Sequence, residues 1–245
     1  MSNTFMRRRR PILLYLVIAA VGIGGLGAVG LVVQVMREPK APSAPRAPVA
    51  SESPGPVTGI GQAGTIPGQV GPLRTLPGTR QVGDVAVGYP HTPVGAVSAA
   101  VYYWSQLSST LDVDRATTLI KLIADPAWTT AVPEIQDGRG KTRALLGLPA
   151  TGPVPDGADV LFTPLMYQVR SVQPDSMDVL LLGYYATSKP GQQLATRVML
   201  FPTKIRWVGD DWKLPAQNLA GDYAPLMATP GSDDALSKGW QPLNS

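Results

Sequence analysis

The strongest constraint on the fold of this chain is an apolar run near its N-terminus. From Ile12 to Val33 there are 22 residues with no charged and no strongly polar side chain. At ~1.5 Å rise per residue, a helix of this length spans ~33 Å, about the hydrocarbon thickness of a bilayer. The run is preceded by Arg7–Arg10 and Pro11. The sequence therefore predicts one transmembrane helix over residues 12–36.

The arginines also predict the orientation of this span. Positive side chains that flank a span stay on the cytoplasmic side, so we expect a basic cytoplasmic N-terminus over residues 1–11. Everything after residue 36 is then extracytoplasmic, and the chain is a single-pass protein of the cell membrane. The alternative is a cleaved signal peptide, whose apolar run is shorter and ends at a small-x-small cleavage site. The segment Gln34–Arg37 that follows the run offers no such site.

The distribution of charge argues against a nucleic-acid-binding domain. Residues 1–83 carry nine Lys/Arg against two Glu, a net charge of +7, whereas residues 84–245 carry twelve Lys/Arg against fifteen Asp/Glu, a net charge of −3. Cations beside a membrane meet anionic head groups, so the lipid bilayer is the expected partner of the basic part. The remainder lacks the basic footprint that nucleic acid requires, and we expect no direct contact with nucleic acid.

The composition of residues 37–83 predicts a linker. These residues hold nine prolines and eight glycines and no aromatic residue. Such a stretch buries too little apolar surface to offset the entropy of ordering it. We therefore expect a disordered Pro/Gly-rich linker over 37–83, with a reach of ~145 Å in fully extended polyproline II form.

The first half of the remaining chain has helical signals. Thr92 is a good N-cap and Pro93 suits the first helical position, so a helix is expected to begin there. A second helix is expected from near Asp112, and Pro126 stops it. Two short helical turns are expected near 127–132 and 141–148.

The second half has extended signals. Strands are expected over Val160–Val172, Met177–Thr187 and Gln193–Val208, with a tight turn at Gly209-Asp210 leading to a last short strand. Pro164 and Pro202 are expected at strand ends, bulges or sheet edges, because proline has no backbone N–H to donate to the hydrogen-bond ladder of a central strand. Helices first and a meander of strands afterwards predict one α+β domain over residues 84–229. A polar tail would follow over residues 230–245, with only Trp240 able to pack back.

Three features of the sequence resemble a known family. They are the arginines with the apolar span, the segment Tyr89–Ala96 that opens the first helix, and the closing hairpin Ile205–Leu214. The order of elements resembles the cone-shaped nuclear-transport-factor-2-like fold. The whole layout resembles the single-span assembly proteins of conjugation and type IV secretion machines of Gram-positive bacteria, and the composition suits an actinobacterial one.

The resemblance implies a membrane-anchored scaffold that acts through protein–protein contacts of its extracytoplasmic domain. Other subunits of an envelope-spanning machine are the implied partners, and a homo-oligomer is possible. No catalytic, cofactor-binding or metal-binding residue is implied, and no cofactor. The alternative is a tethered cone domain that binds or converts a small molecule, as isomerases and cyclases of this fold do.

The residues themselves give little support to catalysis. His91 is the only histidine and the chain has no cysteine, which excludes a multi-histidine or thiolate metal site. As a general base His91 would need an orienting carboxylate, for which Asp84 is one candidate. We expect instead that His91 packs at the start of the first helix.

An acid–base site would have to be lined by other residues inside the cone. The conceivable lining residues are Tyr102, Tyr103, Asp125, Asp178, Tyr184 and Tyr185. Asp210 and Asp211 supply too few oxygens for calcium and are expected to be solvated turn residues. Trp207 and Trp212 are expected to form a structural cross-strand pair around that turn.

Overall fold

The computed structural model describes residues 63–217 and 221–244. The predicted N-terminus, transmembrane helix and most of the predicted linker lie outside these residues. Among the helices of the described part, none has both the length and the apolar character that a membrane span requires.

Three helices form before the main sheet. They are α1 (Pro93–Ser108), α2 (Val113–Ile123) and α3 (Ala131–Leu145). The N-caps of α1 and α2 confirm the predictions, since the side chain of Thr92 accepts a hydrogen bond from the Gly95 N–H and that of Asp112 accepts from the following helical turn. The prediction of two separate turns around residues 127–148 is wrong. One helix runs through most of that segment, because Pro133 lies in its first turn, where a missing N–H costs no bond.

The main sheet is a curled antiparallel meander with two additions at one edge. The predicted strands are confirmed as β4 (Asp159–Gln173), β5 (Ser176–Ser188), β6 (Ala195–Val208) and β7 (Asp211–Lys213). The strands β1 (Leu73–Arg74) and β8 (Gln241–Asn244) extend it, which gives the order β1-β8-β4-β5-β6-β7. A separate hairpin consists of β2 (Arg80–Val82) and β3 (Val85–Val87).

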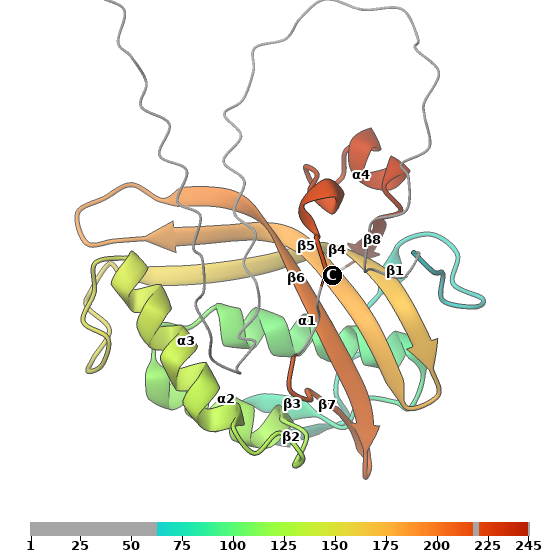
Figure 1. Cartoon of the computed structure of the whole chain (residues 1–245), viewed down its shortest axis with the longest axis horizontal. Coiled ribbons are helices and arrows are strands. Elements are labelled where there is room, and N and C mark those ends of the chain that lie inside the picture. Colours follow the sequence, from blue (N-terminus) through green and yellow to red (C-terminus); the bar gives the residue numbers. More distant parts are fainter. Residues whose placement is uncertain (1–62, 218–220, 245) are drawn as a thin grey trace, which may run out of the picture.

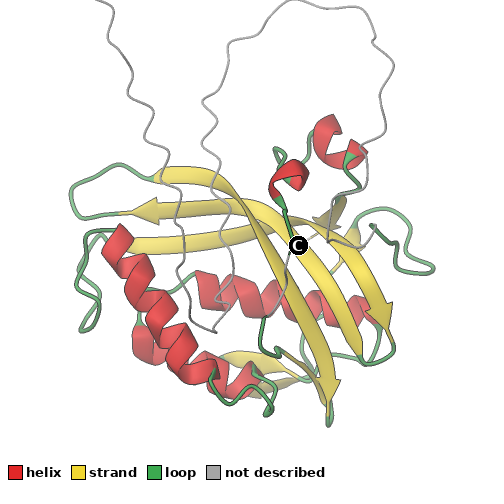
Figure 2. Cartoon of the chain, in the orientation of Figure 1, coloured by secondary structure: helices red, strands yellow, loops and turns green. Residues whose placement is uncertain are grey.

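The sheet curls as a half-barrel around α1, with α2 and α3 beside that helix (Figures 1 and 2). The main core lies on this inner face, where the small side chains of α1 allow the helix to approach the strands closely. Ala96, Ala99 and Ala100 of α1 are fully buried there. The mixed α+β class is therefore as predicted.

The two strand prolines are placed as predicted. Pro164 lies at a β-bulge in β4, where the register with β5 shifts. Pro202 lies on the part of β6 that pairs only with β5, since β7 pairs with β6 only at Arg206–Val208. Opposite the bulge, a Cβ added to Gly183 would stand 2.0 Å from the Thr163 carbonyl oxygen, so this position excludes any side chain.

The outer face of the sheet carries a second core. The segment 221–240, which we call the outer-face segment, includes η1 (Ala224–Leu226) and α4 (Asp233–Ser237) and packs on the sheet on the side away from α1 (Figure 1). Residues 221–229 lie within the predicted domain, but the prediction of a polar tail from residue 230 is wrong, since Ala235 and Trp240 are buried in this core. Trp240 does pack back: it is fully buried, and its Nε1–H donates to the Leu226 carbonyl oxygen at 2.8 Å.

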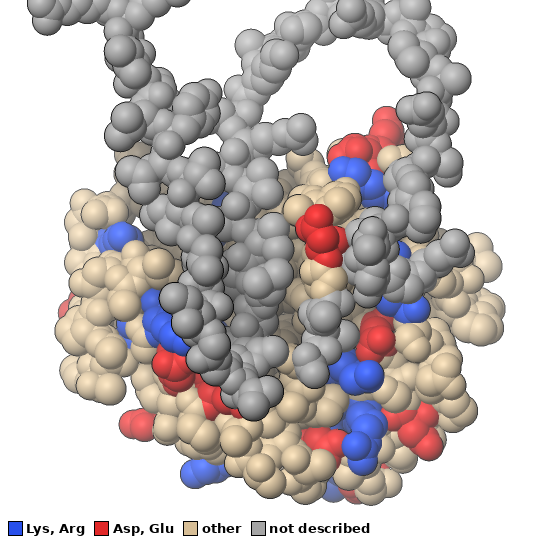
Figure 3. Space-filling view, in the orientation of Figure 1, with Lys and Arg blue, Asp and Glu red and all other residues tan. Residues whose placement is uncertain are grey.

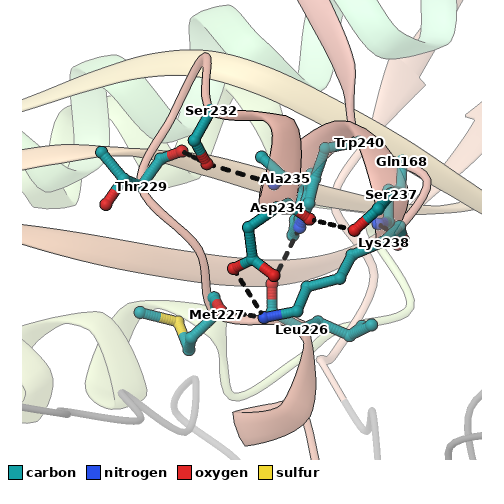
Figure 4. A network of polar contacts seen from close by, with 10 residues as sticks. All are labelled: Gln168, Leu226, Met227, Thr229, Ser232, Asp234, Ala235, Ser237, Lys238 and Trp240. Carbon is teal, nitrogen blue, oxygen red and sulfur yellow. Dashed lines mark hydrogen bonds and ion pairs between the residues drawn. The ribbon is translucent and has the colours of Figure 1, made fainter. Parts of the chain in front are cut away.

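Lys238 forms polar contacts within this C-terminal segment and also joins the segment to the sheet (Figure 4). Its Nζ donates to the Met227 carbonyl oxygen at 2.8 Å and lies 3.0 Å from the Asp234 carboxylate. Its own carbonyl oxygen accepts from the Gln168 side chain of β4 at 2.8 Å. The folded part therefore extends past the predicted boundary at residue 229.

The N-terminal boundary at residue 84 also moves. Ile66 and Leu73 are buried, and Leu73 pairs with Leu243 of β8. The predicted linker thus contributes two strands to the fold, β1 and β2. Isolated apolar residues within the Pro/Gly-rich stretch, such as Leu73, pack against residues that are distant in the sequence.

Candidate functional site

An aromatic cluster joins the start of α1 to the β6–β7 hairpin. The imidazole of His91 stacks on the indole of Trp207, with 4.1 Å between ring centroids and 9° between planes. Trp207 and Trp212 meet edge to face at 5.5 Å across the hairpin, so the predicted cross-strand pair is confirmed. Trp212 is buried and donates through Nε1 to the Pro90 carbonyl oxygen at 2.8 Å, whereas Trp207 is half-buried.

The polar contacts of His91 come from the β4–β5 turn. Its Nε2 lies 2.9 Å from a carboxylate oxygen of Asp175 and 3.1 Å from the Pro174 carbonyl oxygen. The candidate partner Asp84 instead pairs with Arg115. His91 thus ties the turn, the hairpin and the start of α1 together, which supports the predicted packing role.

Asp211 is the buried carboxylate beneath this cluster. Its side chain accepts from the backbone N–H groups of Tyr89 and Trp212 at 2.9 Å each, and from the Tyr103 hydroxyl at 3.3 Å. The Lys213 ammonium lies 3.6 Å away. The prediction that Asp211 is a solvated turn residue is therefore wrong.

The neighbouring Asp210 does behave as predicted, because it lies in the turn between β6 and β7, before β7 begins at Asp211. Its side chain is exposed and pairs with Arg80 at 2.9 Å.

Two tyrosines beside Asp211 are held in the protonated form. Burial raises the pKa of Tyr103 far above its usual value, and the negative charge of Asp211 raises it further. Burial raises the pKa of Tyr89 as well, with smaller contributions from Tyr102 and Asp211. Tyr103 therefore remains a hydrogen-bond donor to Asp211 at physiological pH, and the pair forms a fixed polar contact within the core.

The other residues considered as an acid–base lining do not converge on one site. Asp125 is buried in the turn after α2, where it accepts from the Ala127 N–H at 2.9 Å and lies 3.3 Å from Arg206. Asp178 lies 3.7 Å from Lys204 on the neighbouring strand.

The tyrosines of that set also separate. Tyr184 and Tyr185 are consecutive in β5 and face opposite sides of the sheet. Tyr102 accepts from the Ala86 N–H at 3.0 Å and donates to the Asp84 carbonyl oxygen at 3.3 Å, which binds α1 to the β2–β3 hairpin.

A cleft of about 380 Å³ opens between α1 and the β2–β3 hairpin. Its walls are mostly apolar, and its polar groups are hydroxyls and one amide. It is lined by Thr75, Leu76, Pro77, Gly78, Gln81, Ala86, Tyr89, Ser98, Val101, Tyr102 and Ser105. No carboxylate and no imidazole belongs to this lining, and Tyr102 is the one member of the predicted lining set that does.

Within residues 63–217 and 221–244, no group of three or more Asp, Glu or His side chains is placed to hold a metal ion. The ionisable groups near the aromatic cluster are committed to one another or to the backbone. The arrangement described so far is suited to holding elements together.

Comparison with known proteins identifies the family. A family model described as "Domain of unknown function (DUF8175)" matches residues 69–233. The chain belongs to this family. The match begins before β1 and ends at the first residue of α4, so the DUF8175 domain includes part of the predicted linker and most of the outer-face segment.

No curated protein matches the chain. Among solved structures, the chain is similar to the crystal structure of the intermembrane space region of the chloroplast protein ARC6. The two share 16% sequence identity over 52% of this chain and 97% of that chain, with a TM-score of 0.34. A TM-score this low does not establish a shared fold for the DUF8175 domain.

Proposed function

We propose that this DUF8175 protein is a membrane-anchored scaffold whose extracytoplasmic domain docks other subunits of an envelope-spanning conjugation or secretion machine. The predicted span with its arginines supports the anchoring, and helices that precede a curled meander support a nuclear-transport-factor-2-like domain. The commitment of His91, Asp125 and Asp211 to structural contacts favours binding over catalysis.

The observation that carries this proposal is an uncharged patch on the outer face of the sheet. The register aligns two rows of side chains across β4, β5 and β6. The rows are Thr163–Tyr184–Val198 and Leu161–Ala186–Thr196, which together we call the outer-face patch. All six side chains are half-buried or exposed, and Leu161 is 51% exposed. On the surface that Figure 3 shows, by contrast, positive and negative side chains are interspersed.

The neighbouring part of the same face indicates what kind of partner would fit. There the chain covers its own sheet with η1, α4 and Trp240, and Val198 packs at the border of that second core. We propose that an amphipathic segment of another subunit continues this layer over the outer-face patch. Burial of apolar side chains supplies ~25 cal/mol per Å² for such a contact.

A charge placed in the patch tests the proposal. We expect Leu161→Glu to reduce recovery of partner envelope proteins with the full chain at least tenfold, because the partner would bury an unpaired carboxylate. Val172→Glu is the matched control, since Val172 is an exposed apolar residue at the other end of the same strand. Recovery is measured by quantitative mass spectrometry after purification from the native membrane.

Both variants must retain the wild-type melting temperature for the comparison to count. Equal recovery with Leu161→Glu and Val172→Glu would contradict docking through the outer-face patch. Recovery of the wild-type chain alone would contradict the scaffold function itself.

One observation favours the second candidate, a tethered small-molecule-binding domain. The cleft beside α1 has the volume and the apolar walls typical of ligand sites. Its lack of a carboxylate or imidazole favours binding without chemistry there.

A further inference from the structure

A second group of polar side chains lies on the inner face, where α3 contacts the residues that follow α1. The register sets Phe162, Tyr185 and Arg197 side by side on β4, β5 and β6. The Phe162 N–H donates to the Ser109 hydroxyl at 2.9 Å, which fixes this row to the C-terminal end of α1.

Two guanidinium groups flank Tyr185 in this row. The Arg197 guanidinium carbon lies 5.3 Å from the centre of the Tyr185 ring. Arg139 of α3 donates through Nη1 to the Thr110 carbonyl oxygen at 3.1 Å, and its charge acts on Tyr185 as well. Burial raises the pKa of Tyr185, the positive charges of Arg139 and Arg197 oppose that rise, and the negative charge of Asp159 adds to it by a smaller amount. Both cations therefore act on one phenol.

Neither cation forms an ion pair with a carboxylate of the described chain. No ion pair within 4.0 Å joins Arg139 or Arg197 to an acidic side chain among residues 63–217 and 221–244, whereas Arg80, Arg115 and Arg206 each pair with an aspartate. The Nε of Arg197 is buried without a hydrogen-bond partner in that part of the chain. A buried donor without an acceptor destabilises the fold, so this position favours an acceptor supplied from outside.

Two more unpartnered groups come from α1. Trp104 and Ser108 are one helical turn apart, and their side chains are 8% and 1% exposed. The Trp104 Nε1 and the Ser108 hydroxyl are both buried without a partner among the described residues. The Trp104 ring lies 5.5 Å from that of Phe201, which in turn lies 4.4 Å from Phe162. Hydrogen-bonding groups of Trp104 and Ser108 thus occur beside an apolar wall of aromatic rings.

We propose that this cluster binds a small carboxylic acid with an apolar body. The carboxylate would lie between Arg139 and Arg197, because charge-assisted hydrogen bonds from guanidinium groups are the strongest that a carboxylate accepts. The apolar body would lie against Phe201 and Trp104, whose aromatic rings bury large areas. This site faces the helices and is separate from the outer-face patch, so it goes beyond the docking function.

Binding of simple acids to the full chain tests the site. We choose 3-phenylpropionate, indole-3-propionate and cyclohexanecarboxylate as soluble probes, and 3-phenylpropanol as the uncharged match of the first. Isothermal titration calorimetry is expected to show at least one acid binding in the micromolar to millimolar range. The alcohol is expected to bind at least tenfold more weakly than 3-phenylpropionate.

Substitutions of the two arginines test whether the acid binds at the proposed side chains. Arg197→Gln is expected to weaken the acid at least tenfold, whereas Arg74→Gln, which changes an exposed arginine of β1, leaves the affinity unchanged. Arg139→Gln serves as a second variant if Arg197→Gln lowers the melting temperature. Failure of all three acids to bind at millimolar concentration would overturn the proposal. So would equal binding of acid and alcohol, or equal affinity of both glutamine variants and wild type.

Discussion

At the scale of single residues, the contact between Tyr103 and Asp211 has the clearest consequence for stability. Both side chains are buried between α1 and the β6–β7 hairpin, and the tyrosine donates to the carboxylate at 3.3 Å. The pKa of Tyr103 lies far above its usual value mainly because the phenol is buried, and further because removing its proton would place a second negative charge beside Asp211 in the core.

The raised pKa of Tyr103 predicts a loss of stability at alkaline pH. The unfolded chain releases the tyrosine proton near pH ~10, whereas the folded chain retains it to higher pH. The stabilisation is therefore fully present below pH ~10 and is lost as the pH rises above that value. Tyr103→Phe is expected to cost ~1 kcal/mol at pH 8, because the bond to Asp211 is lost.

The decisive readout for Tyr103→Phe is the slope of stability with pH. Between pH 10 and 11.5, the free energy of unfolding in urea should fall less steeply in the variant, by up to ~1.4 kcal/mol per pH unit. Parallel curves for the variant and wild type would contradict a shifted tyrosine at this position.

At the scale of elements, a single side chain of α3 organises the loop that follows it. Arg143 is fully buried, and its guanidinium donates to five backbone carbonyl oxygens. They belong to Leu111, Pro149, Thr151, Gly152 and Pro153, at 2.5–3.2 Å. The loop from residue 149 to 153 has no ladder of its own, so this side chain satisfies its backbone acceptors.

Replacing Arg143 therefore tests how the loop is held. Arg143→Met is expected to destabilise the folded chain by ~3 kcal/mol or more, since several buried carbonyls lose their donors. Lys141→Met in the same helix is the control, because that ammonium is exposed and forms a surface pair with Asp137; a change within ~0.5 kcal/mol is expected. Urea denaturation measures both, and similar values for the two variants would show that Arg143 is dispensable.

The elements that could be predicted from the sequence are those with local signals. The caps at Thr92 and Asp112 define two helices, and the long apolar strands between turn residues define the meander. β1 and β8 carry no such signal, and in the outer-face segment the one capped helix, α4 after Ser232, is only five residues long. Strands of two to four residues form only through partners far away in the sequence, as Leu73 does with Leu243.

The polar contacts were harder to predict than the elements. The sequence marks Asp211 as a turn residue beside Asp210, and only the structure shows that Asp211 begins β7 with its side chain buried whereas Asp210 stays exposed in the turn. The sequence predicts a packing role for His91, which its ring contacts support, but its partner Asp175 comes from a distant turn. Arg139 and Arg197 belong to no sequence motif. The strand register places Arg197 beside Tyr185, and the charge of Arg139 acts on the same tyrosine from α3.

At the scale of the whole molecule, the proposal depends on which side of the membrane the DUF8175 domain occupies. The arginines before the apolar run predict that the N-terminus is cytoplasmic and the domain extracytoplasmic. The predicted linker between them has the composition of a segment that proteases cut readily, whereas the backbone of the domain is hydrogen-bonded and packed.

Protease added to intact, wall-stripped cells measures this topology most directly. We expect cleavage within residues 37–62, release of a folded fragment that begins there, and a membrane-bound stub that carries Arg7–Arg10. N-terminal sequencing of the released fragment gives the cut site, and release without protease would indicate the cleaved signal peptide instead. Protection of the whole chain until the cells are lysed would place the domain in the cytoplasm and contradict the extracytoplasmic scaffold.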